Sequence, residues 1–324
     1  MSGQAALLRE LFDRSGIIRL VGAHNALGAK LAERAGFDGV WSSGLEISTS
    51  YAVPDASILT MSEHLAAAQS MVEAVRIPVV ADCDTGYGDS NNVIRMVRKF
   101  ESAGVAAVCI EDKLFPKINS LLPARHELAP IGEFAGKIVA AKNAQRSSAF
   151  MVIARGEALV AGLGHHEALK RAHAYVEAGA DAILMHSKSI SPQPIVEFAH
   201  AWDFSAPLVV VPTTYPTIKA RELEELGVKM VIYANHGLRA SVKAMLDVYH
   251  KILEQGSTVG VEEYIVPLSL IFELQGVPLI KKAEDDCPND HVDRTRAIIP
   301  AAGDHIRDPV DPADVDDRSA PGND

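Results

Sequence analysis

The sequence is poor in cysteine, with three residues among 324 and no regular spacing between them. Such usage excludes a disulfide scaffold and a zinc-ribbon pattern, and it is typical of a reducing cytoplasm. No stretch approaches the roughly 20 uninterrupted apolar residues that span a bilayer. The segment Met1–Arg14 also lacks the apolar core of a secretion signal. We therefore expect a cytoplasmic protein without a membrane partner.

Basic residues are also in deficit: 31 Lys and Arg stand against 42 Asp and Glu, which gives a net charge of −11. This balance disfavours nucleic acid and anionic membrane surfaces as main partners, although it allows a local basic pocket. Hydrophobic residues make up 48% of the chain, enough for a large core and too many for a disordered protein. The composition therefore predicts a soluble, folded protein.

No G-x-G-x-x-G motif follows the first apolar strand, which counts against a dinucleotide-binding fold. What recurs instead is a helix that ends in Glu, a small residue and Gly, followed by a short apolar run. The four copies precede residues 39–41, 107–110, 182–185 and 230–233. Glycine just past a helix accepts the left-handed conformation that ends it. The chain therefore reads as repeated helix–strand units.

The apolar runs do not alternate with polar residues, so we expect strands buried on both faces, as in a parallel sheet. The eight expected strands are Leu20–Ala23, Gly39–Trp41, Ile77–Ala81, Ala107–Ile110, Met151–Ala154, Ala182–Met185, Leu208–Val211 and Met230–Tyr233. The helices expected between them include Ser62–Val75, Ile131–Asn143, His165–Ala178 and Ile218–Leu226. Eight such units predict an α/β fold, a closed (β/α)8 TIM barrel.

The composition changes near the C-terminus. Residues 1–281 are expected to form the catalytic barrel domain. In residues 282–324 aspartates alternate with Pro, Gly and Ala, which predicts an acidic, disordered tail. Tyr264–Gln275 is apolar enough for a packed terminal helix or a subunit contact.

Polar side chains follow the expected strands, whose C-terminal ends meet at one mouth of a parallel barrel, where the active site is expected. Asp82, Asp84 and Glu111 are hard oxygen donors on neighbouring strands. Such donors suit Mg²⁺ held partly through water. A lone Asp at a strand end often only caps a loop. The clustering of three acids favours the metal site.

The loop from Leu114 to Pro130, hereafter the gate loop, follows the fourth strand. Lys117, Asn119 and Ser120 supply an ammonium, an amide and a hydroxyl. Donors of these kinds suit a phosphoryl group in transfer. Lysine-rich loops are often merely solvated, but an apolar Phe115-Pro116 pair indicates a segment that folds over a pocket and excludes water.

Other strand ends carry further candidates. Arg155 either pairs with Glu157 or clamps an anionic substrate, and both can hold at once. His186 is either a satisfied core histidine or a ligand. The backbone N–H groups of Ser43–Leu45 can hold an oxyanion, and Trp41 is expected in the barrel wall or mouth.

These residues resemble the phosphoenolpyruvate mutase/isocitrate lyase superfamily, most closely its mutase and phosphonopyruvate hydrolase branches, from about Ile18 to Gln275. The stretches that carry the resemblance are Trp41-Ser42-Ser43-Gly44-Leu45, Asp82-Cys83-Asp84-Thr85-Gly86-Tyr87-Gly88, Glu111-Asp112-Lys113 through Asn119-Ser120, Ala154-Arg155-Gly156-Glu157-Ala158, Met185-His186-Ser187-Lys188 and Ala234-Asn235-His236.

Within the superfamily the gate loop separates the branches. Its carbon–carbon lyases carry a cysteine there that acts as an acid, whereas this chain has Lys117-Ile118-Asn119-Ser120. The Asn-Ser pair resembles the mutases, and the hydrolase has Thr in place of the Asn. Ser50–Ala56 and Val211–Pro216 look more like the hydrolase. We weight the gate loop more and keep the hydrolase as the alternative.

The resemblance implies an isomerase that interconverts phosphoenolpyruvate and phosphonopyruvate with Mg²⁺, in a homodimer or homotetramer that exchanges a terminal helix. By the same resemblance Asp82, Asp84 and Glu111 serve the metal; Trp41, Ser43, Gly44, Leu45 and Asn235 bind substrate; and Asp55, Lys117, Asn119, Ser120, Arg155 and His186 act in catalysis. Two departures stand out. Gly156 replaces the usual Val, which would loosen the surroundings of Arg155, and Cys83 is a small change in volume.

Overall fold

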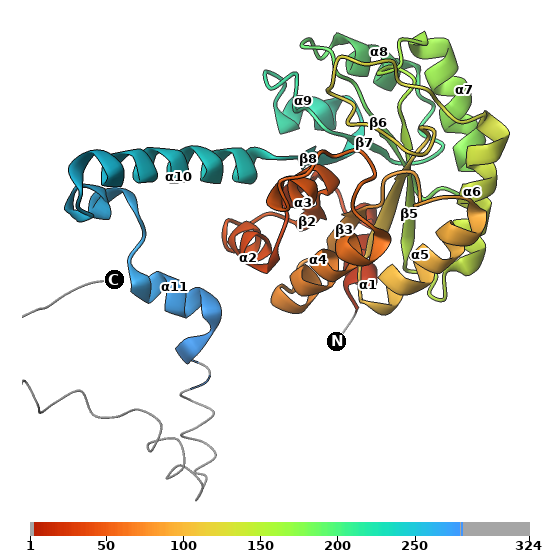
Figure 1. The fold of residues 1–324 in the computed structure, drawn as a ribbon. Coiled ribbons are helices and arrows are strands. Elements are labelled where there is room, and N and C mark those ends of the chain that lie inside the picture. The colour runs from red at the N-terminus through yellow and green to blue at the C-terminus, as the bar shows by residue number, and fades with distance from the viewer. Residues whose placement is uncertain (1–2, 279, 281–324) are drawn as a thin grey trace, which may run out of the picture. The chain divides into compact units, whose positions relative to one another are not determined.

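The computed structural model describes residues 3–278 and 280 of the chain. Eight parallel strands follow one another around a closed barrel, and β1 pairs with β8 to complete it (Figure 1). The strands are β1 Ile18–Ala23, β2 Gly39–Ser42, β3 Val79–Asp82, β4 Ala107–Glu111, β5 Met151–Gly156, β6 Ala182–Met185, β7 Leu208–Val210 and β8 Val228–Tyr233. The predicted (β/α)8 barrel is therefore confirmed.

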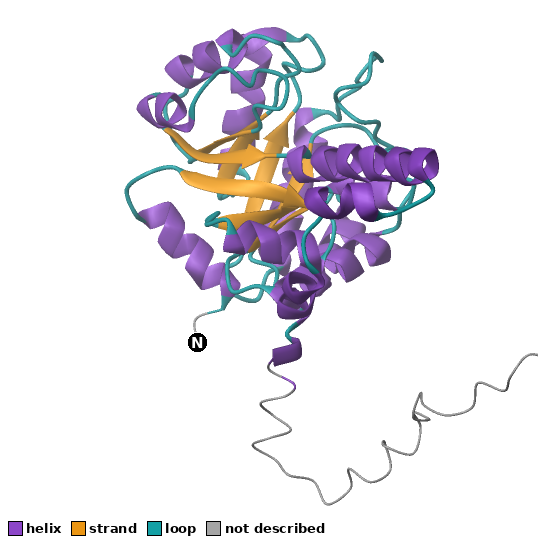
Figure 2. Cartoon of the chain, turned by 90° about the vertical axis from the view of Figure 1, so that its left-hand side faces the viewer, coloured by secondary structure: helices purple, strands orange, loops and turns teal. Residues whose placement is uncertain are grey.

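Helices surround the strands on the outside of the barrel (Figure 2). The helices of the described residues are α1 Gln4–Asp13, α2 Ala26–Arg34, α3 Gly44–Ser50, α4 Met61–Ala74, α5 Ser90–Ser102, α6 Ile131–Ala144, α7 Gly164–Glu177, α8 Gln193–Ala201, α9 Ala220–Glu225, α10 His236–Gln255, a 3-10 helix Val259–Tyr264, and α11 Leu268–Gln275. The four predicted helices lie within two residues of α4, α6, α7 and α9. The backbone N–H groups of Ser43–Leu45, expected to hold an oxyanion, lie at the start of α3.

Two helices that frame the mouth begin with reciprocal caps, which their sequences encode. In α4 the Thr60 hydroxyl accepts from the Glu63 N–H, and the Glu63 carboxylate accepts from the Thr60 N–H at 2.7 Å. In α5 Asp89 and Asn92 do the same. Each cap satisfies N–H groups that the first turn leaves without helical partners.

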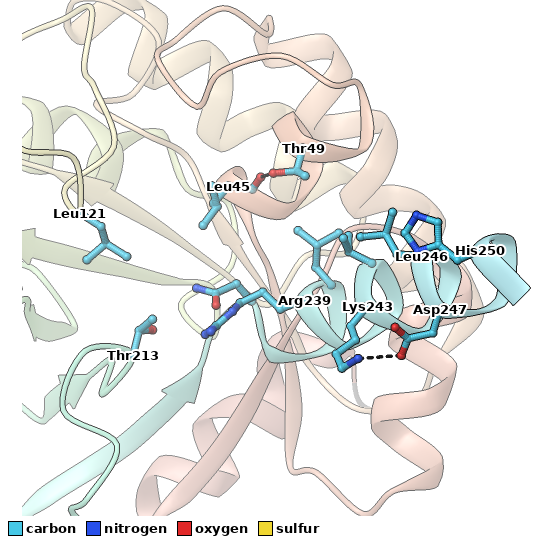
Figure 3. A pocket seen from close by; sticks show the side chains of 12 residues that line it. Leu45, Thr49, Leu121, Thr213, Arg239, Lys243, Leu246, Asp247 and His250 are labelled. Carbon is cyan, nitrogen blue, oxygen red and sulfur yellow. Dashed lines mark hydrogen bonds and ion pairs between the residues drawn. The ribbon is translucent and has the colours of Figure 1, made fainter. Parts of the chain in front are cut away.

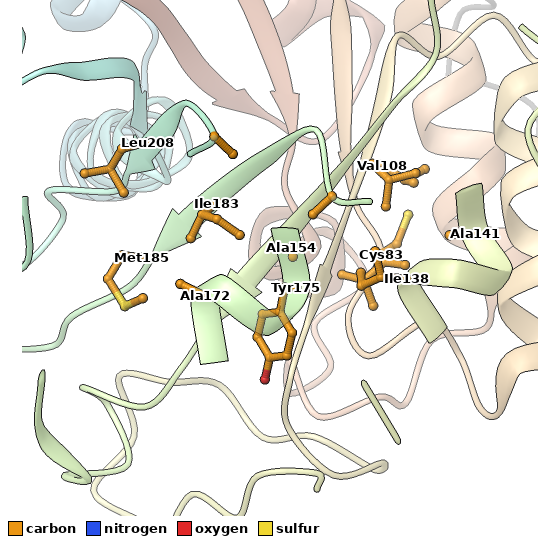
Figure 4. Packing of buried hydrophobic residues seen from close by; sticks show 14 of the residues in the cluster. Cys83, Val108, Ile138, Ala141, Ala154, Ala172, Tyr175, Ile183, Met185 and Leu208 are labelled. Atoms are coloured by element: carbon orange, nitrogen blue, oxygen red, sulfur yellow. The ribbon is translucent and has the colours of Figure 1, made fainter. Parts of the chain in front are cut away.

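Side chains along each strand alternate between the barrel interior and the surrounding helices. The outward set, which includes Val108, Ala154 and Ile183, packs against helix residues such as Ile138 and Tyr175 (Figure 4). The inward set, which includes Cys109, Ile153 and Leu184, fills the barrel together with Leu8 of α1. Both faces of the strands are buried, as predicted.

The same alternation decides which polar side chains reach the mouth. Glu111 is two residues beyond the inward Cys109, Arg155 two beyond Ile153, and His186 two beyond Leu184. All three side chains therefore point toward the barrel axis, as the inward set does. Asp112 has the opposite parity and faces the helices. Glu111 and Arg155 are also register partners on β4 and β5.

The chain divides into two units, Met1–Val266 and Pro267–Asp324. The barrel, α10 and the 3-10 helix belong to the first unit; α11 belongs to the second, in agreement with the predicted helix near Tyr264–Gln275. The expected acidic tail, residues 282–324, lies outside the described residues, so the boundary at 281 stays a prediction. Across residues 3–278 and 280, no helix combines the length and the apolar character that crossing a bilayer requires.

Candidate active site

A cavity of about 50 Å³ lies at the C-terminal end of the strands. The residues that line it are Trp41, Ser43, Leu45, Asp55, Asp82, Lys117, Asn119, Ser120, Leu121, Arg155, His186, Val211, Thr213, Ala234 and Asn235. This set holds every predicted site residue except Gly44, Asp84 and Glu111. Those three contact lining residues directly, so the structure brings all of the predicted residues to one place.

The acidic group is buried at the base of this cavity. Asp84 and Glu111 are each 3% exposed, and each has one carboxylate oxygen, Oδ1 and Oε1 respectively, without a hydrogen bond. Burial raises the pKa of Asp82, and it raises the pKa of Asp84 to about 7. The neighbouring Asp82 carboxylate also raises the pKa of Asp84 by charge repulsion. This group binds protons or cations readily.

Gly44 at the start of α3 lies against these acids. A Cβ added at Gly44 would come within 3.2 Å of Asp82 Oδ2 and 3.5 Å of Asp84 Oδ1. The Gly44 N–H donates to Asp82 Oδ2 at 3.4 Å. Ser43 is the N-cap of α3, and its hydroxyl accepts from the Glu46 N–H at 3.3 Å. Of the backbone donors expected to hold substrate, Gly44 thus already faces a carboxylate.

The charges around the cavity do not balance. Five carboxylates, of Asp55, Asp82, Asp84, Glu111 and Glu157, share it with three cations, of Lys113, Lys117 and Arg155. With all five carboxylates ionised the excess equals the charge of one divalent cation, and the carboxylate oxygens without a hydrogen bond are of the type that Mg²⁺ prefers. Within the described part of the chain, no three His, Cys, Asp or Glu side chains already stand as a direct ligand cluster. The oxygen chemistry and the charge of these acids fit a hard cation such as Mg²⁺.

Two residues of the gate loop meet the barrel at Asp55. The Lys117 ammonium donates to Asp55 Oδ1 and lies 3.1 Å from Asp84 Oδ1. Burial alone would lower the pKa of Lys117, but the surrounding carboxylates raise it above its usual range. Burial would raise the pKa of Asp55, and the contacts with Lys117 and Asn119 hold it lower. The contact is therefore a charged pair.

Asn119 is the second gate-loop residue at Asp55. Its Nδ2 donates to Asp55 Oδ2 at 2.6 Å, and its Oδ1 accepts from the Leu121 N–H at 2.9 Å. An amide nitrogen carries two N–H donors, so one is left to face the cavity.

Arg155, His186 and Ser120 share one buried partner, the carboxylate of Glu157. Arg155 Nε donates to Glu157 Oε1 at 2.5 Å, the Ser120 hydroxyl donates to Oε2 at 2.8 Å, and His186 Nδ1 lies 2.9 Å from Oε1. Burial would raise the pKa of Glu157, but Arg155 and His186 hold it well below its usual range. Burial lowers the pKa of His186. The ring is therefore neutral near pH 7.

Glu157 contacts more of the active-site residues than the sequence led us to expect. It was expected only as a structural partner of Arg155. Arg155-x-Glu157 spacing on one strand was the available signal, because residues two apart share a face.

Ser120 also differs from expectation: its proton goes to Glu157, and it accepts from Lys113 at 2.5 Å and Arg155 at 3.1 Å. In this arrangement Ser120 orients Arg155 and has no donor left for a ligand.

Glu46 was missed, and it positions Asn235. Asn235 has a left-handed backbone, φ 61°, and its N–H donates to Glu46 Oε1 at 2.8 Å. A Cβ at Gly22 would stand 1.9 Å from the same oxygen, so glycine there leaves room for the carboxylate.

The departure at Gly156 is explained similarly: a Cβ would come 3.0 Å from Met185 Cε, and that methyl fills the space a larger residue would take.

A second cavity, of about 790 Å³, adjoins the first and shares Leu45, Leu121, Thr213 and Asn235 with it. Its far wall is one face of α10, where Val242 and Leu246 stand beside the Lys243–Asp247 ion pair (Figure 3). No residue of this 20-residue helix is buried.

A family model described as phosphoenolpyruvate phosphomutase matches residues 8–253. The chain belongs to this family. Phosphonopyruvate hydrolase of Variovorax sp. (strain Pal2) is 47% identical over 279 residues, which are 86% of this chain and 96% of that protein. The crystal structure of phosphoenolpyruvate phosphomutase from Streptomyces platensis subsp. rosaceus is 58% identical with a TM-score of 0.87, and covers 88% of this chain and 99% of its own.

A structure of phosphonopyruvate hydrolase in complex with oxalate and Mg²⁺ is 44% identical with a TM-score of 0.84, and covers 89% of this chain and all of its own. Relatives with either name thus match over nearly their full length. The family is established by these matches, and the choice between the two reactions depends on the site itself.

Proposed function

We propose that this protein interconverts phosphoenolpyruvate and phosphonopyruvate, the isomerisation that forms a C–P bond at the first step of phosphonate biosynthesis. The observation that carries the proposal is Asn119. Its amide stands at the cavity wall, fixed by Asp55, with one N–H available to a migrating phosphoryl group. The mutase relative at 58% identity supports the same assignment.

Asp82, Asp84 and Glu111 would hold Mg²⁺, which would supply Lewis-acid polarisation of the carboxylate and enolate oxygens. Arg155, oriented by Glu157, binds the phosphoryl oxygens. His186 Nδ1 lies 2.9 Å from Arg155 Nη2 and accepts from it in the neutral ring, so His186 binds the same oxygens through its Nε2–H. The Leu45 amide binds the pyruvyl oxygens, because the Ser43 N–H already donates to the Ala23 carbonyl at 3.1 Å. The O–P bond breaks and the C–P bond forms on the same enolate, so the phosphoryl group must stay beside it and away from water.

The gate loop supplies the barrier to water. Lys117 and Asn119 tie it to Asp55, and Ser120 ties it to Glu157, so it is closed over the cavity. Lysyl, amide and hydroxyl groups stand where the lyases of the superfamily carry a thiol. Of the cysteines in the described residues, Cys83 and Cys109 are buried and neither lines the cavity. This disfavours carbon–carbon lyase chemistry.

The alternative function is hydrolysis of phosphonopyruvate to pyruvate and phosphate. It would use the same residues with water admitted to the phosphoryl group. The Variovorax relative, 47% identical, supports this alternative.

Phosphorus NMR of phosphonopyruvate incubated with the protein distinguishes the two. With Mg²⁺ we expect a phosphoenolpyruvate signal, and with excess EDTA we expect no reaction. Inorganic phosphate as the sole product would overturn the mutase in favour of the hydrolase. An unchanged substrate signal in the presence of Mg²⁺ would exclude both.

We also propose a homodimer or homotetramer in which α10 exchanges between copies. The exposed apolar residues Val242, Met245, Leu246 and Tyr249 on this helix support it. The cytoplasmic location stays a prediction from composition.

A further inference from the structure

A buried polar cluster lies behind the active site, between the barrel and α7. Asp112 is fully buried and faces outward from the end of β4. Its Oδ2 accepts from Tyr175 at 2.7 Å and from Arg171 Nη1 at 3.1 Å, and Arg171 Nη1 also lies 3.2 Å from the Tyr175 hydroxyl. Arg171 and Tyr175 are four residues apart on α7, so they share one face of that helix.

The other oxygen of Asp112 holds the backbone of Glu157. The Glu157 N–H donates to Asp112 Oδ1 at 2.9 Å. The side chain of that same residue is the shared partner of Arg155, His186 and Ser120. A shift of Asp112 would therefore move the carboxylate that orients the groups around the phosphoryl position.

The cluster also holds the C-terminal end of the gate loop. The Ala129 N–H donates to the Asp112 carbonyl at 2.9 Å, and Arg171 Nη1 donates to the Ala129 carbonyl at 3.0 Å. Nearby, Lys113 and Leu128 form an antiparallel bridge. The buried Asp112–Arg171 ion pair thus contacts Glu157, which orients Arg155, and also the C-terminal end of the gate loop.

The stability of the folded protein does not by itself require the buried Asp112–Arg171 ion pair. A buried ion pair costs desolvation, and apolar residues of similar volume are often equally stabilising. What such a pair gives is fixed geometry, because each of its donors and acceptors demands one direction. None of the three residues lines the cavity.

We propose that Arg171 and Tyr175 are positioning residues that act through Asp112 on Glu157 and the gate loop, and so keep the migrating phosphoryl group from water. This rests on the proposed mutase function. Without the Arg171 or Tyr175 contacts to Asp112 the substrate still binds, but isomerisation slows and a larger share of turnovers ends in inorganic phosphate.

The test compares Tyr175→Phe and Arg171→Met with the unaltered protein, using phosphonopyruvate, Mg²⁺ and phosphorus NMR. Tyr175→Phe removes one hydroxyl and keeps the ring that packs on Phe134 at 4.6 Å. We expect kcat for isomerisation to fall about tenfold, as for other groups that orient catalytic residues. The KM should stay nearly unchanged, and the phosphate share should rise several-fold.

Arg9→Met is the matched control. Arg9 pairs with Asp181 at 2.6 Å, just before β6 and so at the opposite end of the barrel. It should lower thermal stability without changing the product ratio. As a second measurement, hydrogen exchange should quicken at the Ala129 amide in Tyr175→Phe and Arg171→Met only.

The outcomes separate this inference from the proposed function. If the unaltered protein forms phosphoenolpyruvate and both α7 variants match the control in product ratio and exchange, the residues are structural and the inference is wrong. If the unaltered protein forms only phosphate or nothing, the mutase proposal fails first and this inference falls with it.

Discussion

Asn119 illustrates how much of the proposed chemistry depends on one side chain. Its carbonyl oxygen and one N–H are used within the protein, on Leu121 and Asp55. Only the remaining N–H is available to the transferred group. The assignment of the reaction is therefore testable at a single atom.

Asn119→Ala should lower kcat about a hundredfold with little change in KM, as expected for loss of a donor that acts in the transition state. Steady-state kinetics with phosphonopyruvate and Mg²⁺ measures both. Asn143→Ala, at an exposed position of α6, is the control. Near-normal turnover of the Asn119 variant would contradict the mechanism.

His186 makes stability depend on pH. Burial lowers its pKa from 6.5, so below pH 6.5 this residue binds a proton more readily in the unfolded chain than in the native state. The contribution of His186 to the free energy of unfolding should therefore fall as pH drops from 6.5 toward the native pKa, by about 1.4 kcal/mol per unit of pKa difference. Asp84, whose pKa is raised to about 7, contributes in the opposite direction over the same range, so the comparison with His186→Asn isolates the histidine.

Urea unfolding at pH 7.5 and 5.5 measures this loss. His186→Asn keeps a polar group beside Glu157 but does not titrate, so its stability should fall less over the same range. Equal losses in both proteins would show that His186 does not contribute.

At the scale of elements, the gate loop is held by charge more than by packing. Phe115 and Leu122 within it are about half exposed, whereas Lys117 is 5% exposed between Asp55 and Asp84. An apolar replacement at 117 leaves two carboxylates facing each other.

Lys117→Met should therefore loosen the gate loop and leave the barrel intact. We expect amide exchange at residues 114–122 to quicken roughly tenfold or more, consistent with loss of a hydrogen bond to a charged group. Lys219→Met, at the N-cap of α9, is the control. Unchanged exchange in the loop would show that the loop is held by other contacts.

At the scale of the molecule, the proposed assembly depends on α10, a helix without a buried residue. Leu246 is 51% exposed and Val242 40% exposed, and both line the cavity of about 790 Å³ beside the active site. A second copy would cover this surface.

Leu246→Glu should shift the protein to a smaller assembly, because a charge in an apolar contact costs several kcal/mol when desolvated. Light scattering after size exclusion measures the mass. Val139→Glu, at an exposed apolar position on α6, should leave the mass unchanged. A monomeric unaltered protein would contradict the proposed assembly.

Local sequence patterns were enough to predict the barrel and the residues that lie at its mouth. Apolar runs at regular intervals define strands buried on both sides, and residues at the ends of such strands lie at the mouth when they share the parity of the inward side chains. Asp82, Glu111, Arg155 and His186 follow from this reasoning because they are local to their strands.

Which side chains these site residues contact could be read only from the folded structure. Glu157 serves three residues from separate segments, Asn119 meets Asp55 across 64 positions, and Asp112 is held by α7. Contacts of this kind depend on how far each helix and loop extends in space, and no local pattern records that. The same holds for the balance of charge, since five carboxylates and three cations become one group only when the strands close.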